Sequence, residues 1–174
     1  MKNTVYILMA CAVALLSSCD KDDIGGTATE AMAGEWWVTC TCVDEDGNTV
    51  YEDDEFFGLG SFTVLTYNTA DNVADKIWVD DQGNFWEFQV KCDADQSTLT
   101  FSTGGEEVAN NYYDCNVEIS GGKIMYGNAT TPSGVAADSI VFYVKFDDDP
   151  YPYYYGFDSY KISGFRYTGF DADE

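Results

Sequence analysis

Cys19 is the residue whose surroundings most clearly predict a chemical role. It ends the run Leu16-Ser17-Ser18-Cys19, which follows Lys2 and the uncharged, apolar segment 5–16. An apolar segment of this length is typical of an export signal and is too short to span a bilayer. The small side chains of Ser17 and Ser18 let a peptidase approach the backbone, and the Cys19 thiol is a nucleophile that can accept a diacylglyceryl group. We therefore expect residues 1–18 to be a lipoprotein signal peptide and Cys19 to be the lipidated first residue of the mature protein.

The segment 19–30 is expected to be an acidic tether. Asp20-Lys21-Asp22-Asp23 follows the cysteine directly and resembles the export signal of surface lipoproteins in Bacteroidota. The acyl chains on such a cysteine together contribute more hydrophobic free energy than stable membrane anchoring needs. The expected location is therefore the outer membrane, with the protein exposed at the cell surface, and a periplasm-facing anchor is the alternative.

The charge balance excludes one large class of partner. The chain carries 31 acidic and 8 basic residues, a formal net charge of −23, and loses only one basic residue with the signal peptide. Such a field repels phosphate groups, so nucleic acid is not an expected partner. The apolar content of 45% is nevertheless too high for a disordered acidic chain, and residues 31–174 suit one folded domain.

Catalytic chemistry is restricted because the chain has no histidine. This excludes Ser-His-Asp and Cys-His catalysis and every zinc motif that uses imidazole. A pair of carboxylates could still support a hydrolase, but with 31 acidic residues the sequence does not single out any one pair as catalytic. We assign no catalytic residue, no metal and no cofactor.

Four further cysteines, Cys40, Cys42, Cys92 and Cys115, fall on apolar faces of predicted strands. They could be reduced thiols in the core, two disulfides between strands, or a four-thiolate metal site. Cys40 and Cys42 are two residues apart on one strand and are not expected to bond to each other. The spacing does not determine a pairing among the possible disulfides.

Alternating apolar and polar residues predict an all-β fold. A short helical turn is expected at 28–33, and turn residues such as Asp46-Gly47 and Gly121-Gly122 separate the alternating runs. Closure removes exposed strand edges, so we expect a single antiparallel up-and-down barrel of about eight strands, with a β-sandwich as the alternative. The predicted strands are 35–43, 61–67, 76–80, 84–92, 98–102, 112–120, 123–126, 139–147 and 159–168.

The same alternation assigns side chains to the barrel interior. Trp36, Val38, Cys40 and Cys42 share one face of the first strand, and aromatic or β-branched residues share one face of later strands. An interior of this size is either filled by side chains or holds one small ligand. The candidate ligand-binding residues are Val38, Trp86, Phe88, Val90, Phe142 and Val144.

A tyrosine-rich loop, 150–157, offers another surface for recognition. Tyr151, Tyr153, Tyr154, Tyr155 and Phe157 lie in it beside two prolines. Aromatic rings on a rigid loop can stack on sugars or anchor a protein. They can also cover the mouth of a barrel, which is the interpretation we favour.

Two resemblances refine this picture. Gly34-Glu35-Trp36 resembles the G-x-W that opens lipocalin-like barrels, in which the tryptophan closes the barrel floor and packs against a basic residue of the last strand. Arg166 is the only arginine here and lies in the last predicted strand. The resemblance therefore implies a barrel-closing pair, Trp36 and Arg166, with a cation–π contact.

A more extensive resemblance covers nearly the whole mature chain. It is carried by the runs Ala33-Gly34-Glu35-Trp36-Trp37-Val38, Leu65-Thr66-Tyr67-Asn68-Thr69-Ala70, Ile77-Trp78-Val79-Asp80-Asp81-Gln82-Gly83-Asn84-Phe85-Trp86, Thr131-Pro132-Ser133-Gly134, Ala137-Asp138-Ser139-Ile140-Val141-Phe142-Tyr143 and Lys161-Ile162-Ser163-Gly164-Phe165-Arg166-Tyr167-Thr168-Gly169-Phe170. In these runs the chain resembles the Bacteroidota lipoprotein family of lipid-binding putative hydrolases. The resemblance implies a calycin-type barrel and supplies no catalytic residues.

We therefore expect a membrane-anchored lipoprotein whose barrel binds a lipid or another small apolar ligand. One alternative is a surface module that binds glycans or proteins through the loop 150–157. The other alternative is a carboxylate-dependent hydrolase.

Overall fold

The computed structural model describes residues 26–173, and in these the fold is all-β apart from short helical turns. The signal peptide, Cys19 and most of the tether lie outside the described residues. The elements in chain order are η1 (Glu30–Met32), β1 (Gly34–Val43), β2 (Thr49–Tyr51), α2 (Asp53–Phe56), β3 (Phe62–Asn68), β4 (Lys76–Asp80), β5 (Gln89–Asp95), β6 (Thr100–Ser102), β7 (Val108–Ala109), β8 (Asn116–Thr130), β9 (Ala136–Phe146), α3 (Tyr151–Tyr155), β10 (Ser159–Arg166) and η2 (Asp171–Asp173).

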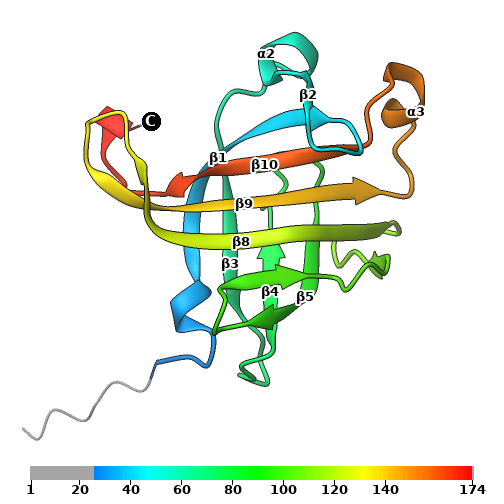
Figure 1. Cartoon of the computed structure of the whole chain (residues 1–174). Helices are drawn as coiled ribbons and strands as arrows, with labels where there is room; N and C mark the ends of the chain where they lie inside the picture. Colours follow the sequence, from blue (N-terminus) through cyan, green and yellow to red (C-terminus); the bar gives the residue numbers. More distant parts are fainter. Residues whose placement is uncertain (1–25, 174) are drawn as a thin grey trace, which may run out of the picture.

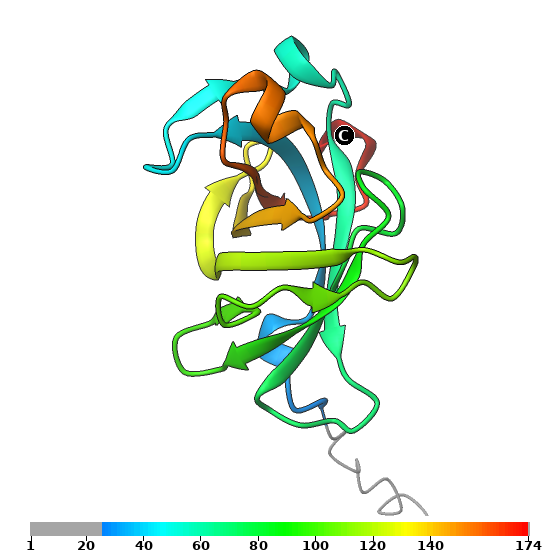
Figure 2. The same cartoon turned by 90° about the vertical axis from the view of Figure 1, so that its right-hand side faces the viewer.

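The strands form one closed antiparallel barrel (Figures 1 and 2). Hydrogen-bonded neighbours follow the order β10-β9-β8-β6-β5-β4-β3-β1, and β10 pairs with β1 from Trp36↔Arg166 to Val43↔Ser159. This last pairing closes the circle of eight strands. The predicted all-β barrel is confirmed, and the alternative sandwich is not formed because the first and last strands are partners.

The strand β8 differs from the prediction. Residues 116–130 form one long strand, whereas two strands joined at Gly121-Gly122 were expected. The register with β9 shifts between Ser120 and Lys123, which marks a β-bulge. Gly121 has a φ of +59°, and a Cβ on Gly122 would collide with the Phe101 carbonyl oxygen of β6. The two glycines therefore bend one strand around the barrel instead of reversing it.

The prediction is also wrong for residues 84–88, which were expected to begin a strand. β5 begins only at Gln89. The reason is Asp81, a fully buried carboxylate that accepts the backbone N–H groups of Gly83, Phe85, Trp86, Glu87 and Phe88 at 2.8–3.0 Å. Backbone donors that converge on one carboxylate cannot also form a strand ladder, so this segment folds as a turn around Asp81. We call residues 81–88 the Asp81 turn.

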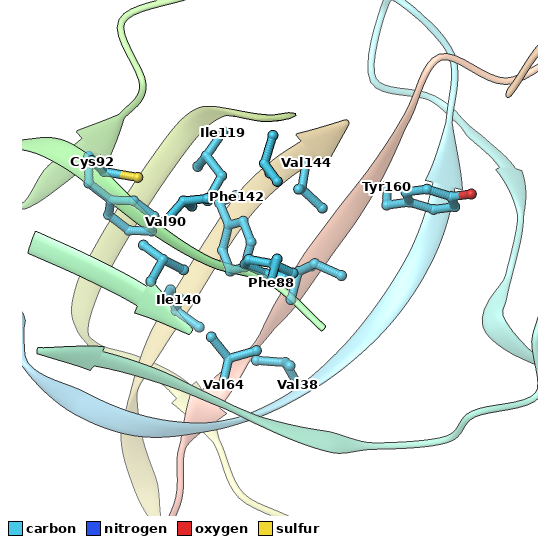
Figure 3. Close-up of a cluster of buried hydrophobic side chains, with 14 of the residues drawn as sticks. Val38, Val64, Phe88, Val90, Cys92, Ile119, Ile140, Phe142, Val144 and Tyr160 are labelled. Atoms are coloured by element: carbon cyan, nitrogen blue, oxygen red, sulfur yellow. The ribbon is translucent and has the colours of Figure 1, made fainter. Parts of the chain in front are cut away.

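The barrel interior is a continuous hydrophobic core (Figure 3). Valines, isoleucines and phenylalanines from all sides of the barrel meet there, and Val64, Val90, Ile119 and Phe142 are among the side chains less than 1% exposed. Hydrogen-bonded strands surround this core on all sides, so the two ends of the barrel decide what reaches it.

The two ends are covered differently. η1 and the point where the described chain begins lie at one end, and α2 lies at the other, beside α3 (Figures 1 and 2). Within residues 26–173, no helix is long and apolar enough to cross a membrane.

Candidate functional site

Five of the six candidate ligand-binding side chains lie together in the barrel interior. Val38, Phe88, Val90, Phe142 and Val144 are each at most 1% exposed and belong to one core cluster (Figure 3). In this conformation they pack against one another. A ligand that used these side chains would therefore have to displace part of the packed core.

The sixth candidate, Trp86, lies at the end of the interior. The Asp81 turn holds it there half-buried, and its ring stacks on Phe146 with a centroid distance of 5.0 Å. Its indole Nε1 faces Asp148 at 3.5 Å. Trp86 thus covers the core from the side of α2 and α3.

Aromatic side chains close this end of the barrel, and we call them the aromatic cap. α2 and the residue after it supply Phe56 and Phe57, the Asp81 turn supplies Phe85 and Trp86, and α3 with its flank supplies Tyr151, Tyr155 and Phe157. Phe56 sits at the centre, with ring centroids 4.6–5.8 Å from those of Phe57, Tyr151, Tyr155 and Phe157. The loop 150–157 therefore does contribute to a cover over the barrel mouth.

Ring contacts continue without a break from the cap into the core. Tyr151 contacts Trp86 at 6.0 Å, and Trp86 contacts Phe146 at 5.0 Å. Phe146 contacts Phe88 at 5.7 Å, and Phe88 contacts Phe142 at 6.5 Å. An apolar path thus runs from a partly exposed tyrosine to the middle of the barrel.

One carboxyl group lies beside this path. Asp149 accepts a hydrogen bond from the buried Tyr160 hydroxyl at 2.6 Å and another from the Tyr151 backbone N–H at 2.8 Å. Burial raises the pKa of Asp149, although the Tyr160 hydrogen bond acts in the opposite direction. The pKa of Tyr160 is raised by its own burial and by Asp149. The base of the cap is therefore unfavourable for a ligand that carries a negative charge.

The surface of the cap is hollowed between α2 and α3. A pocket of about 330 Å³ lies there, lined by Glu55, Phe56, Phe57, Tyr151 and Tyr155. It is within the size range of small-molecule sites. Three of these residues, Glu55, Phe56 and Phe57, had no place among the sequence candidates, although a phenylalanine doublet after an acidic run is a visible signal.

The other end of the barrel is closed by the contact that the G-x-W resemblance implies. The Arg166 guanidinium lies 4.5 Å from the centroid of the Trp36 ring. Arg166 also donates to the Ala33 carbonyl and to Asp138, while the indole of the fully buried Trp36 donates to Thr66 Oγ1 at 2.8 Å. This charged, hydrogen-bonded network therefore closes this end of the barrel and does not provide an entrance. We call it the Trp36–Arg166 floor.

The cysteines Cys40, Cys42, Cys92 and Cys115 are all buried free thiols, so none of the possible disulfides is formed. The register explains this, because Cys40 lies opposite Ile162, Cys42 opposite Tyr160, and Cys92 opposite Ile77. Burial raises the pKa of Cys42 to about 12 and also raises the pKa values of Cys40 and Cys92. These three thiols are therefore protonated at neutral pH and act as core side chains.

One group among the described residues could offer three metal ligands. The ligand atoms of Cys115, Asp147 and Asp148 lie within 4.8 Å of one another. Asp147 accepts two hydrogen bonds from Asn116, and Asp148 accepts one from the Tyr113 hydroxyl at 3.0 Å. These bonds attach Tyr113 and the start of β8 to the two residues that follow β9, which accounts for the group without an ion.

No curated protein matches the chain. A family model described as lipid-binding putative hydrolase matches residues 21–171, which is most of the chain. The chain therefore belongs to the family of lipid-binding putative hydrolases.

Proposed function

We propose that this protein is a lipid-anchored carrier or sensor that binds one small, apolar, uncharged ligand inside its barrel. The observation that carries the proposal is the unbroken apolar path from Tyr151 through Trp86 and Phe146 to Phe88 and Phe142. Membership in a lipid-binding family supports it.

The ligand would enter through the aromatic cap. The opposite end is held by the Trp36–Arg166 floor, whereas the cap consists of two helices of four and five residues. Gly58, just past α2, and Gly156, at the end of α3, have φ values of +62° and +74°. Short helices that end in such glycines can rearrange about these residues, so cap residues would give way to the apolar part of a ligand.

The charge of the protein would select against fatty acids. Asp149 lies at the base of the cap, and the formal net charge of the chain is −23. A carboxylate ligand would meet this negative potential as it lost water, which costs free energy. A long-chain alcohol has the same apolar part without the charge.

The test compares two probes that differ only at the head. Purified full-length protein is titrated with 1-hexadecanol and with palmitate, and binding is followed by quenching of tryptophan fluorescence and by native mass spectrometry. We expect one alcohol molecule to bind per chain and palmitate to bind at least about tenfold more weakly, a difference of roughly 1.4 kcal/mol. Val144→Ile adds one methylene group to the packed interior and should weaken alcohol binding, with the folding of the variant checked by circular dichroism, whereas Tyr154→Leu on the outside should not. Retention of neither probe would overturn the proposal.

We further propose that Cys19 carries the anchor, with residues 1–18 removed, 19–30 as the tether and 31–174 as the barrel domain. Support comes from the run Leu16-Ser17-Ser18-Cys19 and from the chain's entry at η1, at the end opposite α2 (Figure 1). The cap would then face away from the membrane, at the cell surface if the acidic tether directs export. Mass spectrometry of the N-terminal peptide, compared between parent cells and cells that carry Cys19→Ser, tests the acylation. Protease treatment of intact cells tests the exposure at the cell surface.

A second candidate function rests on two tyrosines outside the cap. Tyr153 and Tyr154 are 87% and 73% exposed, and their rings contact each other at 5.4 Å. A rigid exposed aromatic pair can stack on a sugar or anchor a protein. Binding to a glycan array that is lost in the double variant Tyr153→Ser, Tyr154→Ser would favour this function over an interior ligand.

A further inference from the structure

We infer that the pocket between α2 and α3 binds a quaternary ammonium group, such as the trimethylammonium of choline. The inference concerns the outer surface of the aromatic cap and does not rest on entry of a ligand into the barrel.

The first support is the aromatic lining. Four of the five lining residues are aromatic: Phe56, Phe57, Tyr151 and Tyr155. The Phe56 ring is inclined by 90° to the Tyr155 ring and by 82° to the Tyr151 ring, and the two tyrosine rings are inclined by 61°. Rings inclined to one another can offer their electron-rich faces to more than one side of a cation, which is how quaternary ammonium ions are recognised.

The second support is the charge of the lining. Among the described residues that line the pocket, Glu55 is the only charged one, and none is a lysine or arginine. Glu55 Oε2 accepts the backbone N–H of Glu52 in a capping box, so α2 holds this carboxylate at the pocket. One fixed carboxylate beside aromatic rings complements a single positive charge and repels phosphates and carboxylates.

The third step concerns the kind of cation. A primary ammonium group needs acceptors for three N–H groups, and aromatic rings replace its hydration poorly. A trimethylammonium group has no N–H to satisfy and has an apolar surface. The pocket volume of about 330 Å³ is ample for such a group and small for a whole lipid.

The experiment titrates the full-length protein with choline and with 3,3-dimethyl-1-butanol, in which carbon replaces the charged nitrogen. Saturation-transfer NMR and calorimetry report binding. We expect choline to bind at least about fivefold more tightly than the neutral isostere, which corresponds to roughly 1 kcal/mol for a cation over aromatic rings. Equal binding of the two compounds, or binding of neither, would overturn the inference.

Matched variants locate the site. Glu55→Gln preserves an acceptor for the capping box and should weaken choline binding at least about threefold, and Tyr155→Leu should weaken it more. Tyr154→Leu, on the same helix but outside the pocket, and Glu45→Gln, on the β1–β2 loop and outside the pocket lining, should leave it unchanged. Equal weakening by Tyr154→Leu and Tyr155→Leu would place binding elsewhere and defeat the inference.

Vesicles distinguish the two sources of this group. If the pocket takes a lipid headgroup, phosphatidylcholine vesicles should sediment with the protein and phosphatidylglycerol vesicles should not, and Glu55→Gln should reduce the effect. If choline binds but the vesicles do not, the ligand is the free cation. The alcohol and palmitate titrations are read separately, because Val144→Ile should weaken hexadecanol binding and leave choline binding unchanged.

Discussion

At the scale of single residues, Asp81 has the largest structural role of the acidic side chains described. It is fully buried and accepts five backbone N–H groups of the turn that carries Phe85 and Trp86 into the cap. Asp81→Ala leaves these donors without an acceptor and should lower the free energy of unfolding by about 3 kcal/mol or more. Urea denaturation measures this, and the exposed Asp71→Asn should change it by less than about 0.5 kcal/mol. A loss of similar size in both variants would contradict the role of Asp81.

Arg166 is the second residue with a specific prediction. Arg166→Met keeps apolar bulk but removes the charge above Trp36 and the hydrogen bonds to Ala33 and Asp138. The side chain is partly exposed, so we expect a loss of about 1–2 kcal/mol and a change in Trp36 fluorescence. Lys91→Met removes a comparable contact, with Lys91 Nζ 5.1 Å from the Trp78 ring, at an exposed site. Lys91→Met should lower the free energy of unfolding by less than about 1 kcal/mol. An equal loss in the two variants would argue against a stabilising role of Arg166 at the Trp36–Arg166 floor.

At the scale of elements, the strand β8 shifts register with β9 twice, between Ser120 and Lys123 and between Met125 and Ala129, and the glycines in these two places should matter for different reasons. Gly122→Ala would push a Cβ into the Phe101 carbonyl oxygen and ring, so β6 and β8 must separate. Gly127 has a φ of +60° but nothing within 4 Å of the added Cβ. We therefore expect Gly122→Ala to destabilise by about 2–4 kcal/mol and Gly127→Ala by about 1 kcal/mol. Thermal unfolding followed by circular dichroism separates these costs, and the reverse order would refute a close β6–β8 approach.

At the scale of the whole molecule, Asp173 attaches the end of the described chain to the turn before β9. The carboxylate accepts the Ser133 backbone N–H and the Thr168 hydroxyl, and hydrogen bonding from Ser133 and then Thr168 lowers its pKa to about 2. A carboxyl group whose pKa is lower in the folded than in the unfolded chain stabilises the fold above about pH 4. That contribution is lost as the pH falls towards 2.

The expected outcome is a stability difference that depends on pH. Asp173→Asn should be less stable than the parent above about pH 4, and the difference should shrink between about pH 4 and pH 2. Thr168→Val removes one donor, so NMR titration should show a higher carboxyl pKa for Asp173 than in the parent. A stability difference that stays constant down to pH 2 would contradict the linkage.

Local pattern was enough to predict much of this fold. The alternation in β1, β3, β4 and β9 follows directly from one buried and one exposed face, and β4 has the predicted bounds Lys76–Asp80. The interior positions of Val38, Val90, Phe142 and Val144 follow from the same period, whereas Phe88 reaches the interior from the Asp81 turn. The position of Trp86 did not follow from this period. Asp81 accepts the backbone N–H groups of the turn that contains Trp86, and this interrupts the alternation.

The sequence alone determined the all-β class, the two-faced strands, the absence of histidine chemistry and the expectation of lipidation at Cys19, since these depend on residue types and short-range spacing. Only the tertiary structure decided that Gly121-Gly122 bends one strand, that the cysteines meet apolar partners, and that Glu55, Phe56, Phe57, Tyr151 and Tyr155 share one pocket. The physical reason is that each of these outcomes depends on contacts between segments far apart in the chain. Residues 55–57 and 151–155 become neighbours only when β10 pairs with β1 and closes the barrel beneath them.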